Sequence, residues 1–447
     1  MHDLIVIGAG PGGYEAAAHA GELGKKVVLV EAGSLGGACL NVGCIPAKVF
    51  LRSSRLYREC AEAGPFGVRV EGVSFEAPVM VERKNRIVAS LRRGVAAKLK
   101  GAGVEVVTGR ARLVGRHLVE VGDAQLEAEN VLIATGSRPA IPPIPGIDAE
   151  HVLDSDRIFD LAEVPSSIAI IGGGYIGLEL ATYFREVGAE VAVFEMLPQI
   201  AASCDRDVSV RLLQALQRGG IDFHLSCRVL SVERGGLRYD DGSGTERTHV
   251  AERIVNATGR APVVAGLGLE EVGVDFSAAG IRISDQGKTS APGLWACGDV
   301  TGQHMLAHAA TREGIVAVNS MFGIPDRIRY EAIPAVIYTH PEVAMAGRTE
   351  EELTRAGIPF RKATVPMGVA GRFLIENEGG SGFVKVLVGG RGGEILGVHA
   401  VGDSSSEFIV VGAALIETAL TARQAAEVVF PHPTVSEALR EAILKVG

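Results

Sequence analysis

The sequence predicts an α/β protein with two Rossmann-like dinucleotide-binding domains, the second inserted in the first, followed by a C-terminal α+β domain. Three observations predict this fold class. An apolar strand runs into a glycine-rich turn and a helical pattern at residues 4–23, and the same unit returns at residues 167–184. From residue 330 the composition changes and leads to strand patterns at 382–388 and 395–401. A chain of 447 residues has room for about three domains.

The first glycine-rich turn has the spacing of a dinucleotide-binding fingerprint. Gly8 permits a tight turn after the strand, Gly10 lets backbone N–H groups reach a pyrophosphate, and Gly13 allows the helix to pack closely. A second apolar strand then ends in Glu31, whose carboxylate can accept a hydrogen bond from a ribose 2′-hydroxyl. A fingerprint alone is weak evidence, and this acidic residue strengthens it.

Two cysteines follow in a glycine-rich segment. Cys39 and Cys44 are separated by four residues, and Pro46 and Lys48 come directly after them. Paired cysteines are more often inert than redox-active, but a dithiol beside a cofactor cradle has the two parts that a redox reaction needs. We therefore interpret this pair as a redox centre. The six cysteines of the chain are too few and too scattered for a secreted disulfide framework.

Residues 79–100 have apolar residues at every fourth position and predict a helix with a basic outer face. Its basic residues are Arg83, Lys84, Arg86, Arg92, Arg93, Lys98 and Lys100. Such a charge run is usually only a solvated surface, and the alternative is a docking surface for an acidic partner.

The second unit repeats the first at a constant interval. Its fingerprint glycines and its acidic residue are Gly172, Gly174, Gly177 and Glu195, and 172 − 8, 174 − 10, 177 − 13 and 195 − 31 all equal 164. We infer two dinucleotide sites in one chain. The second is expected to take a nicotinamide cofactor, because a redox dithiol needs an external hydride partner. Glu195 would repel a 2′-phosphate, and no Arg or Lys lies between it and Cys204, so NAD is favoured over NADP.

Charge and hydropathy exclude other classes. Lys and Arg number 44 against 53 acidic residues, so the net charge of −9 argues against nucleic-acid binding as the main function. The most apolar stretch, residues 168–184, contains glycines and Glu179 and is not typical of a membrane span. We expect a soluble cytoplasmic protein. His304 and His308 lack a third partner with ligand spacing, so no metal is expected.

The cysteine segment resembles the active-site disulfide of the flavin-dependent pyridine nucleotide-disulfide oxidoreductases. Residues 40–41 and 43–46 resemble the dihydrolipoamide dehydrogenase branch more than glutathione or mercuric reductase. Ala38 and Ala47 replace the usual Thr and Ser of the family, which are also small residues. The resemblance extends over essentially the whole chain, including a terminal His-Pro-Thr motif, and it implies FAD and NAD as cofactors.

The resemblance also implies the binding residues. For FAD they are Gly8, Gly10, Gly13, Glu31, Lys48, Ala111, Thr135, Gly136, Asp299, Met305, Leu306 and Ala307. For NAD they are Gly172, Gly174, Gly177, Glu195, Val229 and Gly259.

Catalytic roles follow from the same resemblance. Cys39 would exchange with the substrate sulfur, Cys44 would contact the flavin, and Lys48 would pair with Glu179 near the ring. His432 would take the substrate thiol proton while Glu437 holds its imidazole. His432 would reach the disulfide of the other subunit of a homodimer. The alternative is that Glu437 serves only in a capping box formed by residues 434–437.

The implied function is that of a dihydrolipoamide dehydrogenase that oxidises a dihydrolipoyl group. The implied partner is a lipoyl-bearing carrier protein or the acyltransferase core of a 2-oxoacid dehydrogenase or glycine cleavage complex, with neither nucleic acid nor a membrane involved. The alternatives are a reductase of another disulfide or of a metal ion, and a non-catalytic flavoprotein sensor or complex subunit. We expect an FAD domain at 1–146, an NAD domain at 147–265, a central domain with the second FAD segment at 266–329, and an interface domain at 330–447.

Overall fold

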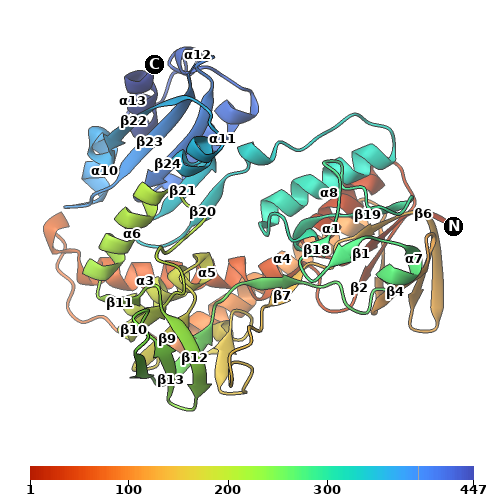
Figure 1. Cartoon of the computed structure of the whole chain (residues 1–447), viewed down its shortest axis with the longest axis horizontal. Coiled ribbons are helices and arrows are strands. Elements are labelled where there is room, and N and C mark those ends of the chain that lie inside the picture. The colour runs from red at the N-terminus through yellow and green to blue at the C-terminus, as the bar shows by residue number, and fades with distance from the viewer. Residues whose placement is uncertain (391) are drawn as a thin grey trace.

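The computed structural model describes residues 1–390 and 392–447, and its backbone forms three large sheets with flanking helices (Figure 1). The first sheet has seven strands in the order β3-β2-β1-β6-β5-β4, with β19 beside β6. The pairs β1–β2, β1–β6, β2–β3 and β6–β19 are parallel, as in a Rossmann-like sheet. The strands are β1 (His2–Ile7), β2 (Val27–Glu31), β3 (Glu105–Thr108), β4 (Ala111–Gly115), β5 (Leu118–Val121), β6 (Ala124–Ile133) and β19 (Leu294–Ala296).

Five helices accompany the first sheet: α1 (Pro11–Glu22), α2 (Gly37–Asn41), α3 (Cys44–Ala61), α4 (Ala77–Gly101) and α8 (Ala307–Met321). Two of them, α2 and α3, contain the redox segment. The apolar face of α4 is buried through Met80, Val88, Val95 and Leu99, but Leu91 is exposed, so the apolar repeat of every fourth residue is only partly buried. Lys84, expected on the basic outer face, is buried and pairs with Asp160.

The chain returns to the first sheet after completing the second. Strand β19 pairs in parallel with the end of β6, with Leu294 opposite Val131 and Ala296 opposite Ile133. The second unit is therefore inserted in the first, which confirms the predicted topology. The connection between the units includes a two-stranded ribbon of β7 (Ser137–Pro139) and β16 (Arg260–Pro262). Short elements near the return are α7 (Leu269–Val272), β17 (Phe276–Ser277) and β18 (Gly280–Ile281).

The second sheet is parallel throughout, in the order β11-β10-β9-β15-β8. Its strands are β8 (Val152–Asp154), β9 (Ser167–Ile171), β10 (Glu190–Phe194), β11 (Ile221–His224) and β15 (Arg253–Asn256). An antiparallel sheet of β12 (Arg228–Glu233), β13 (Gly236–Asp240) and β14 (Glu246–Val250) adjoins it. The helices of this unit are α5 (Tyr175–Glu186) and α6 (Arg206–Arg218).

The third sheet is antiparallel, in the order β20-β21-β24-β23-β22, and lies in the C-terminal part of the chain (Figure 1). Its strands are β20 (Ala335–Ile337), β21 (Val343–Gly347), β22 (Phe360–Pro366), β23 (Phe383–Gly389) and β24 (Ile395–Val401). Its helices are α9 (Glu350–Arg355), α10 (Gly371–Glu376), α11 (Ser405–Glu417), α12 (Ala422–Ala425) and α13 (Glu437–Val446). The sheet and its helices form an α+β unit, as the change in composition predicts.

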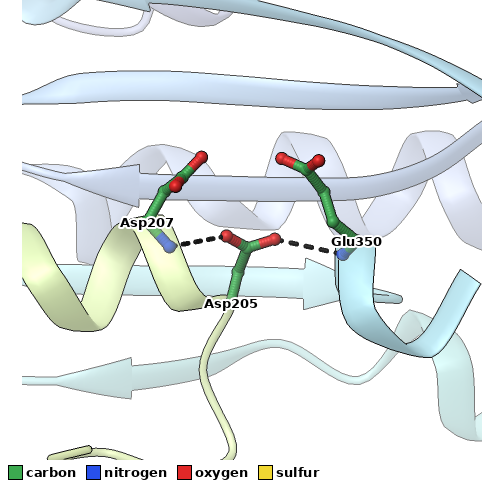
Figure 2. Close-up of side chains that lie close together, drawn as sticks. All are labelled: Asp205, Asp207 and Glu350. Carbon is green, nitrogen blue, oxygen red and sulfur yellow. Dashed lines mark hydrogen bonds between the residues drawn. The ribbon is translucent and has the colours of Figure 1, made fainter. Parts of the chain in front are cut away.

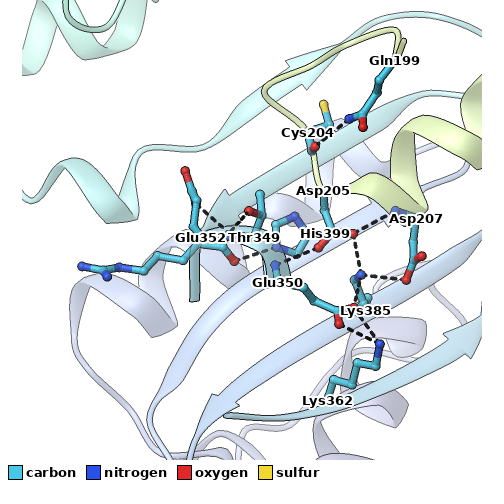
Figure 3. A network of polar contacts seen from close by, with 11 residues as sticks. Gln199, Cys204, Asp205, Asp207, Thr349, Glu350, Glu352, Lys362, Lys385 and His399 are labelled. Carbon is cyan, nitrogen blue, oxygen red and sulfur yellow. Dashed lines mark hydrogen bonds and ion pairs between the residues drawn. The ribbon is translucent and has the colours of Figure 1, made fainter. Parts of the chain in front are cut away.

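A buried cation joins the second unit to the third. Lys385 Nζ on β23 lies 2.5 Å from Asp205 Oδ1, 2.9 Å from Asp207 Oδ2 and 2.5 Å from Glu350 Oε1. Figure 2 shows the carboxylate of Asp205 between the backbone N–H groups of Asp207 and Glu350, and Figure 3 shows Lys385 among the three acidic side chains. Because Lys385 is completely buried, loss of its acidic partners would leave an uncompensated buried charge at the contact between the two units.

The most apolar long stretch, residues 168–184, forms β9 and most of α5, separated by a glycine turn. Across residues 1–390 and 392–447, none of the helices has the length and apolar character needed to cross a membrane.

Candidate active site

The redox segment lies directly on the first glycine-rich turn. Cys39 is in the short helix α2 and Cys44 is the first residue of α3. Gly37 has a φ of 59°, and a Cβ at this position would lie 2.5 Å from the Cα of Gly10. Only glycine permits this approach, which brings the cysteines against the expected cofactor cradle.

The two thiols interact and titrate differently. A hydrogen bond from Cys39 and the positive charge of Lys48 outweigh burial and lower the pKa of Cys44 to about 7. The same hydrogen bond, together with burial, raises the pKa of Cys39 well above its ordinary value. In the reduced pair, Cys44 is therefore the sulfur that carries the negative charge near neutral pH.

An arginine on α4 holds the redox helix from outside. Arg92 Nη2 donates to Asn41 Oδ1 at 2.6 Å, and Asn41 Nδ2 donates to the carbonyl oxygens of Leu35 and Gly37 at 3.0 and 2.8 Å. Asn41 lies between the two cysteines in the sequence. The contact thus connects an exposed helix to the position of Cys39.

A cavity of about 550 Å³ extends from the cysteines along the first glycine-rich turn. Most of the residues expected to bind FAD line it, together with both cysteines and Glu179: Gly8, Gly10, Glu31, Lys48, Thr135, Gly136, Asp299, Met305, Leu306 and Ala307. A Cβ at Gly13 would lie 1.9 Å from the carbonyl oxygen of Gly8, so this glycine closes the turn from behind. The narrow turn, the start of α1 and an acidic residue after β2 fit a dinucleotide.

Two carboxylates, those of Glu31 and Asp299, line this cavity. Glu31 accepts hydrogen bonds from the backbone N–H groups of Ala9 and Gly33, both at 2.6 Å. Asp299 Oδ2 accepts a hydrogen bond from Ser137 Oγ at 2.5 Å. Ala111, at the start of β4, is not among the residues that line the cavity.

Lys48 and Glu179 meet at the cavity beside Cys44. Lys48 Nζ lies 2.9 Å from Glu179 Oε1 and 2.8 Å from Oε2, and it lies 4.4 Å from the centre of the Tyr338 ring. The backbone N–H of Tyr338 donates to the same carboxylate at 3.0 Å. This pair places a fixed positive charge next to a thiol whose pKa it helps to lower.

The second fingerprint has the same geometry as the first. Gly172 has a φ of 114°, and a Cβ at Gly177 would lie 2.0 Å from the carbonyl oxygen of Gly172. Glu195 accepts from the N–H groups of Gly173 and Leu197 at 2.6 and 2.8 Å, as Glu31 does in the first unit. Of the other residues expected at this site, Gly174 and Gly259 are exposed in turns, whereas Val229 is buried in β12.

His432 and Glu437 lie together, away from the cysteines. His432 Nδ1 is 2.8 Å from Glu437 Oε1, the imidazole side chain is 80% exposed, and neither residue lines the cavity. Glu437 Oε2 also accepts from the N–H of Thr434 at 2.9 Å. Only one of the two hydrogen bonds of a capping box is present at residues 434–437, the one from the Thr434 N–H to Glu437. The helix α13 begins at Glu437, and its N-cap Ser436 makes no side-chain hydrogen bond to the first turn.

The chain matches one protein family over most of its length. The model for pyridine nucleotide-disulphide oxidoreductases matches residues 2–314, and the model for the dimerisation domain of these enzymes matches residues 333–443. The chain belongs to the pyridine nucleotide-disulphide oxidoreductase family. Members of this family use FAD and NAD.

Relatives of this oxidoreductase match it from end to end. It is 41% identical to dihydrolipoyl dehydrogenase 3 of Pseudomonas aeruginosa, over 100% of this chain and 98% of that protein. It is 37% identical to the mitochondrial dihydrolipoyl dehydrogenase of Dictyostelium discoideum, over 99% and 94% of the two chains. The crystal structure of LpdA from Mycobacterium tuberculosis aligns with a TM-score of 0.91 and 26% identity, covering both chains completely.

The oxidoreductase has cavity residues that sequence analysis missed. Arg260 Nε donates to Ser137 Oγ at 2.8 Å, and Ser137 in turn donates to Asp299. Arg260 also contacts Asp156 at 3.0 Å. In the sequence, Arg260 is only a cation that directly follows the Ala-Thr-Gly segment at residues 257–259. The structure shows that it supports Asp299 through Ser137.

The histidines considered as metal ligands have other partners. His304 precedes α8 and stacks on the ring of Tyr330 at 4.6 Å, while His308 Nε2 lies 2.7 Å from the carbonyl oxygen of Pro334. The one group of acidic side chains in the described residues with metal-ligand spacing is that of Asp205, Asp207 and Glu350. Lys385 supplies the cation of that group.

Proposed function

We propose that the protein is a dihydrolipoyl dehydrogenase, which oxidises a protein-bound dihydrolipoyl dithiol to the disulfide and reduces NAD. The observation that carries this proposal is the match of dihydrolipoyl dehydrogenases to nearly the whole chain, at 41% and 37% identity. The redox segment on the FAD cavity supports it. The overall reaction converts a dithiol and NAD⁺ into a disulfide, NADH and one proton.

The cysteines carry out the exchange with the substrate. A substrate thiolate attacks the sulfur of Cys39 in the Cys39–Cys44 disulfide, and Cys44 leaves as a thiolate. The second substrate thiol then displaces Cys39, so the substrate closes its own disulfide and two electrons remain on the enzyme pair. The lowered pKa of Cys44 supports its role as the leaving sulfur.

The cavity residues would hold FAD, which would supply the two-electron transfer from the cysteine dithiol to NAD. Lys48, fixed by Glu179, stabilises negative charge on the ring system. Asp299 would accept a hydrogen bond from the ribityl chain of FAD, and Glu31 would accept one from its ribose. Gly172, Gly174, Gly177, Glu195, Val229 and Gly259 form the NAD site.

His432 completes the site of a second copy. Its imidazole takes a proton from the substrate thiol, because only the thiolate is a competent nucleophile, and Glu437 orients the ring. His432 is highly exposed and does not line the cavity of its own chain. The match to the dimerisation domain supports a homodimer. In our proposal, His432 faces the cysteines of the other subunit.

We assign residues 1–146 to the FAD domain, 147–265 to the NAD domain, 266–329 to a central domain and 330–447 to the interface domain. The return of β19 to the first sheet and the second family match at residue 333 support this division. The partner is a lipoyl carrier or the acyltransferase core of a 2-oxoacid dehydrogenase or glycine cleavage complex. A cysteine pair that is reduced and reoxidised in each turnover, in a chain without a secreted disulfide framework, fits the cytoplasm.

Steady-state assays test the proposal. Dihydrolipoamide, glutathione disulfide and mercuric ion would each be offered with NAD(H) and with NADP(H). We expect the highest kcat/KM for dihydrolipoamide with NAD. A higher value for glutathione disulfide or mercuric ion would reject the lipoyl assignment and favour one of the other reductases.

A further inference from the structure

Helix α4 carries a straight row of exposed cations on its outer face. Arg86, Arg93 and Lys100 follow one another at intervals of seven residues, and all three are exposed. Seven residues make almost two helical turns, so the cations lie on one side, about 10 Å apart. Between them lie the small residues Ala89, Ser90, Gly94, Ala96 and Ala97, which leave the charged ends accessible. We call these three cations the basic row.

The charge of the basic row is not neutralised within the chain. The ion pairs of α4 are made by Lys84 with Asp160 and by Lys98 with Glu15. Within residues 1–390 and 392–447, the three cations of the row have no carboxylate partner. Glu82 is the only acidic residue of α4, which has seven basic ones, whereas the chain as a whole has a net charge of −9. The row is therefore a local positive surface on an acidic protein.

The helix that carries the basic row also contacts the redox segment. Arg92, which precedes Arg93, makes the hydrogen bond at 2.6 Å to Asn41 in α2. Helix α2 also contains Cys39, the sulfur proposed to receive the substrate. A protein bound along α4 would thus be held close to the point where its dithiol must react.

We propose that the basic row docks an acidic surface of the protein domain that carries the dihydrolipoyl group. This inference rests on the proposed function, and it adds that the lipoyl-bearing partner docks through a negatively charged surface. The whole chain has a net charge of −9, and without the three cations of the row it would be −12, so the rest of the surface repels an acidic domain and the row selects the face on which that domain approaches. The free dithiol has no such charge, and its reaction does not depend on the row.

The test compares a carrier domain with a small substrate. The probes are an isolated reduced lipoyl domain of net negative charge and free dihydrolipoamide, assayed on the FAD-loaded full chain. The variant combines Arg86→Glu, Arg93→Glu and Lys100→Glu, and leaves Arg92 in place. Its control combines Lys26→Glu, Arg234→Glu and Arg327→Glu, three exposed residues without ion pairs in the described chain, and has the same change in net charge.

At low salt, we expect the variant to lose about tenfold or more in kcat/KM for the lipoyl domain, mostly through KM. The control should lose much less, and both should keep the native rate with dihydrolipoamide. For the native enzyme, raising the salt concentration toward about 0.1 M should lower the rate with the lipoyl domain. At that salt concentration, attraction between exposed charges more than about 10 Å apart is largely screened. Flavin absorbance and melting temperature verify folding. A milder variant with Gln at the three positions should show a smaller loss in the same direction.

Equal losses of kcat/KM for the lipoyl domain in the row variant and its control would overturn the proposed docking surface. A row variant that loses activity with the lipoyl domain and with free dihydrolipoamide to the same extent would overturn it as well. Failure of the proposed function gives a different result, because the native enzyme would then be inactive with free dihydrolipoamide.

Discussion

Lys48 Nζ lies 2.8 Å from Glu179 Oε2, and this ion pair joins α3 of the first unit to α5 of the second at the cavity. Glu179 is nearly buried, whereas Lys48 is about one-third exposed. The lysine thus presents its charge to the cavity while the glutamate holds it in place. Removing the lysine charge should affect the flavin more than the fold.

Without the cation, negative charge on the reduced flavin ring is less stable, so Lys48→Met should make the reduction potential of bound FAD more negative. We expect a shift of about 30 mV or more, which corresponds to about 1.4 kcal/mol in a two-electron couple. Turnover should fall at least tenfold. The measurement is a spectroscopic redox titration, with Lys26→Met as a control far from the cavity. An unchanged potential in Lys48→Met would show that the cation does not act on the flavin.

The two sulfurs can be distinguished by replacing Cys39. Cys39→Ser retains a hydroxyl donor and leaves a Cys44 thiolate, so a long-wavelength charge-transfer band should appear without reductant. Because the pKa of Cys44 is lowered to about 7, the band should grow as the pH rises through neutrality and fade below it.

Cys39→Ala removes the donor that is the main cause of the lowered pKa. The midpoint of the band should therefore move to a higher pH than in Cys39→Ser. Cys44→Ser is the control and should show no band at any pH. A band in Cys44→Ser and none in Cys39→Ser would reverse the assignment of the two sulfurs.

Glu195 should give the second site a strong preference for NAD. Its carboxylate is fixed by the N–H groups of Gly173 and Leu197 and can accept from a ribose 2′-hydroxyl. A hydrogen bond to a charged group is worth about 1.5–3 kcal/mol, so Glu195→Gln should lower kcat/KM for NAD by about tenfold or more. Use of NADP should improve. Comparable kcat/KM values for NAD and NADP in the native enzyme would contradict this prediction.

Glu437→Gln separates a catalytic role from a capping role. Glutamine can still accept from the N–H of Thr434, so the melting temperature should change little. The loss of negative charge beside His432 should lower turnover with dihydrolipoamide by about 10²-fold or more. Normal turnover would show that Glu437 serves only the start of α13.

Mixed dimers test whether His432 acts across subunits. If Cys44→Ser and His432→Gln chains are refolded together at random, about half of the dimers are hybrids with one intact composite site. Activity should return in roughly a quarter of all sites, although each variant alone is inactive. Hybrid dimers without activity would place the complete site within one chain.

Local features of the sequence were sufficient to predict the two fingerprints and the redox segment. The turns at Gly8 and Gly172 need a backbone conformation that only glycine adopts easily, so their sequence spacing reports their geometry directly. The constant offset between Glu31 and Glu195 likewise corresponds to matching hydrogen bonds in the two units.

Contacts between distant segments could not be predicted in this way. The hydrogen bond of Arg92 to Asn41 and the support of Asp299 by Ser137 depend on how helices and turns pack in three dimensions. Lys385 reads in the sequence as a surface cation at an alternating position of a strand, yet it is completely buried. Its acidic partners come from α6 and α9, and no local pattern connects them.

The late return of β19 to the first sheet has a consequence for synthesis on the ribosome. Strand β6 ends at Ile133 and its neighbour β19 begins at Leu294, about 160 residues later. At about 5–20 residues per second, the edge of β6 waits roughly 8 to 30 seconds for its neighbour. An unpaired strand edge of this kind is open to pairing with other chains, so a nascent molecule is most vulnerable to aggregation during this interval.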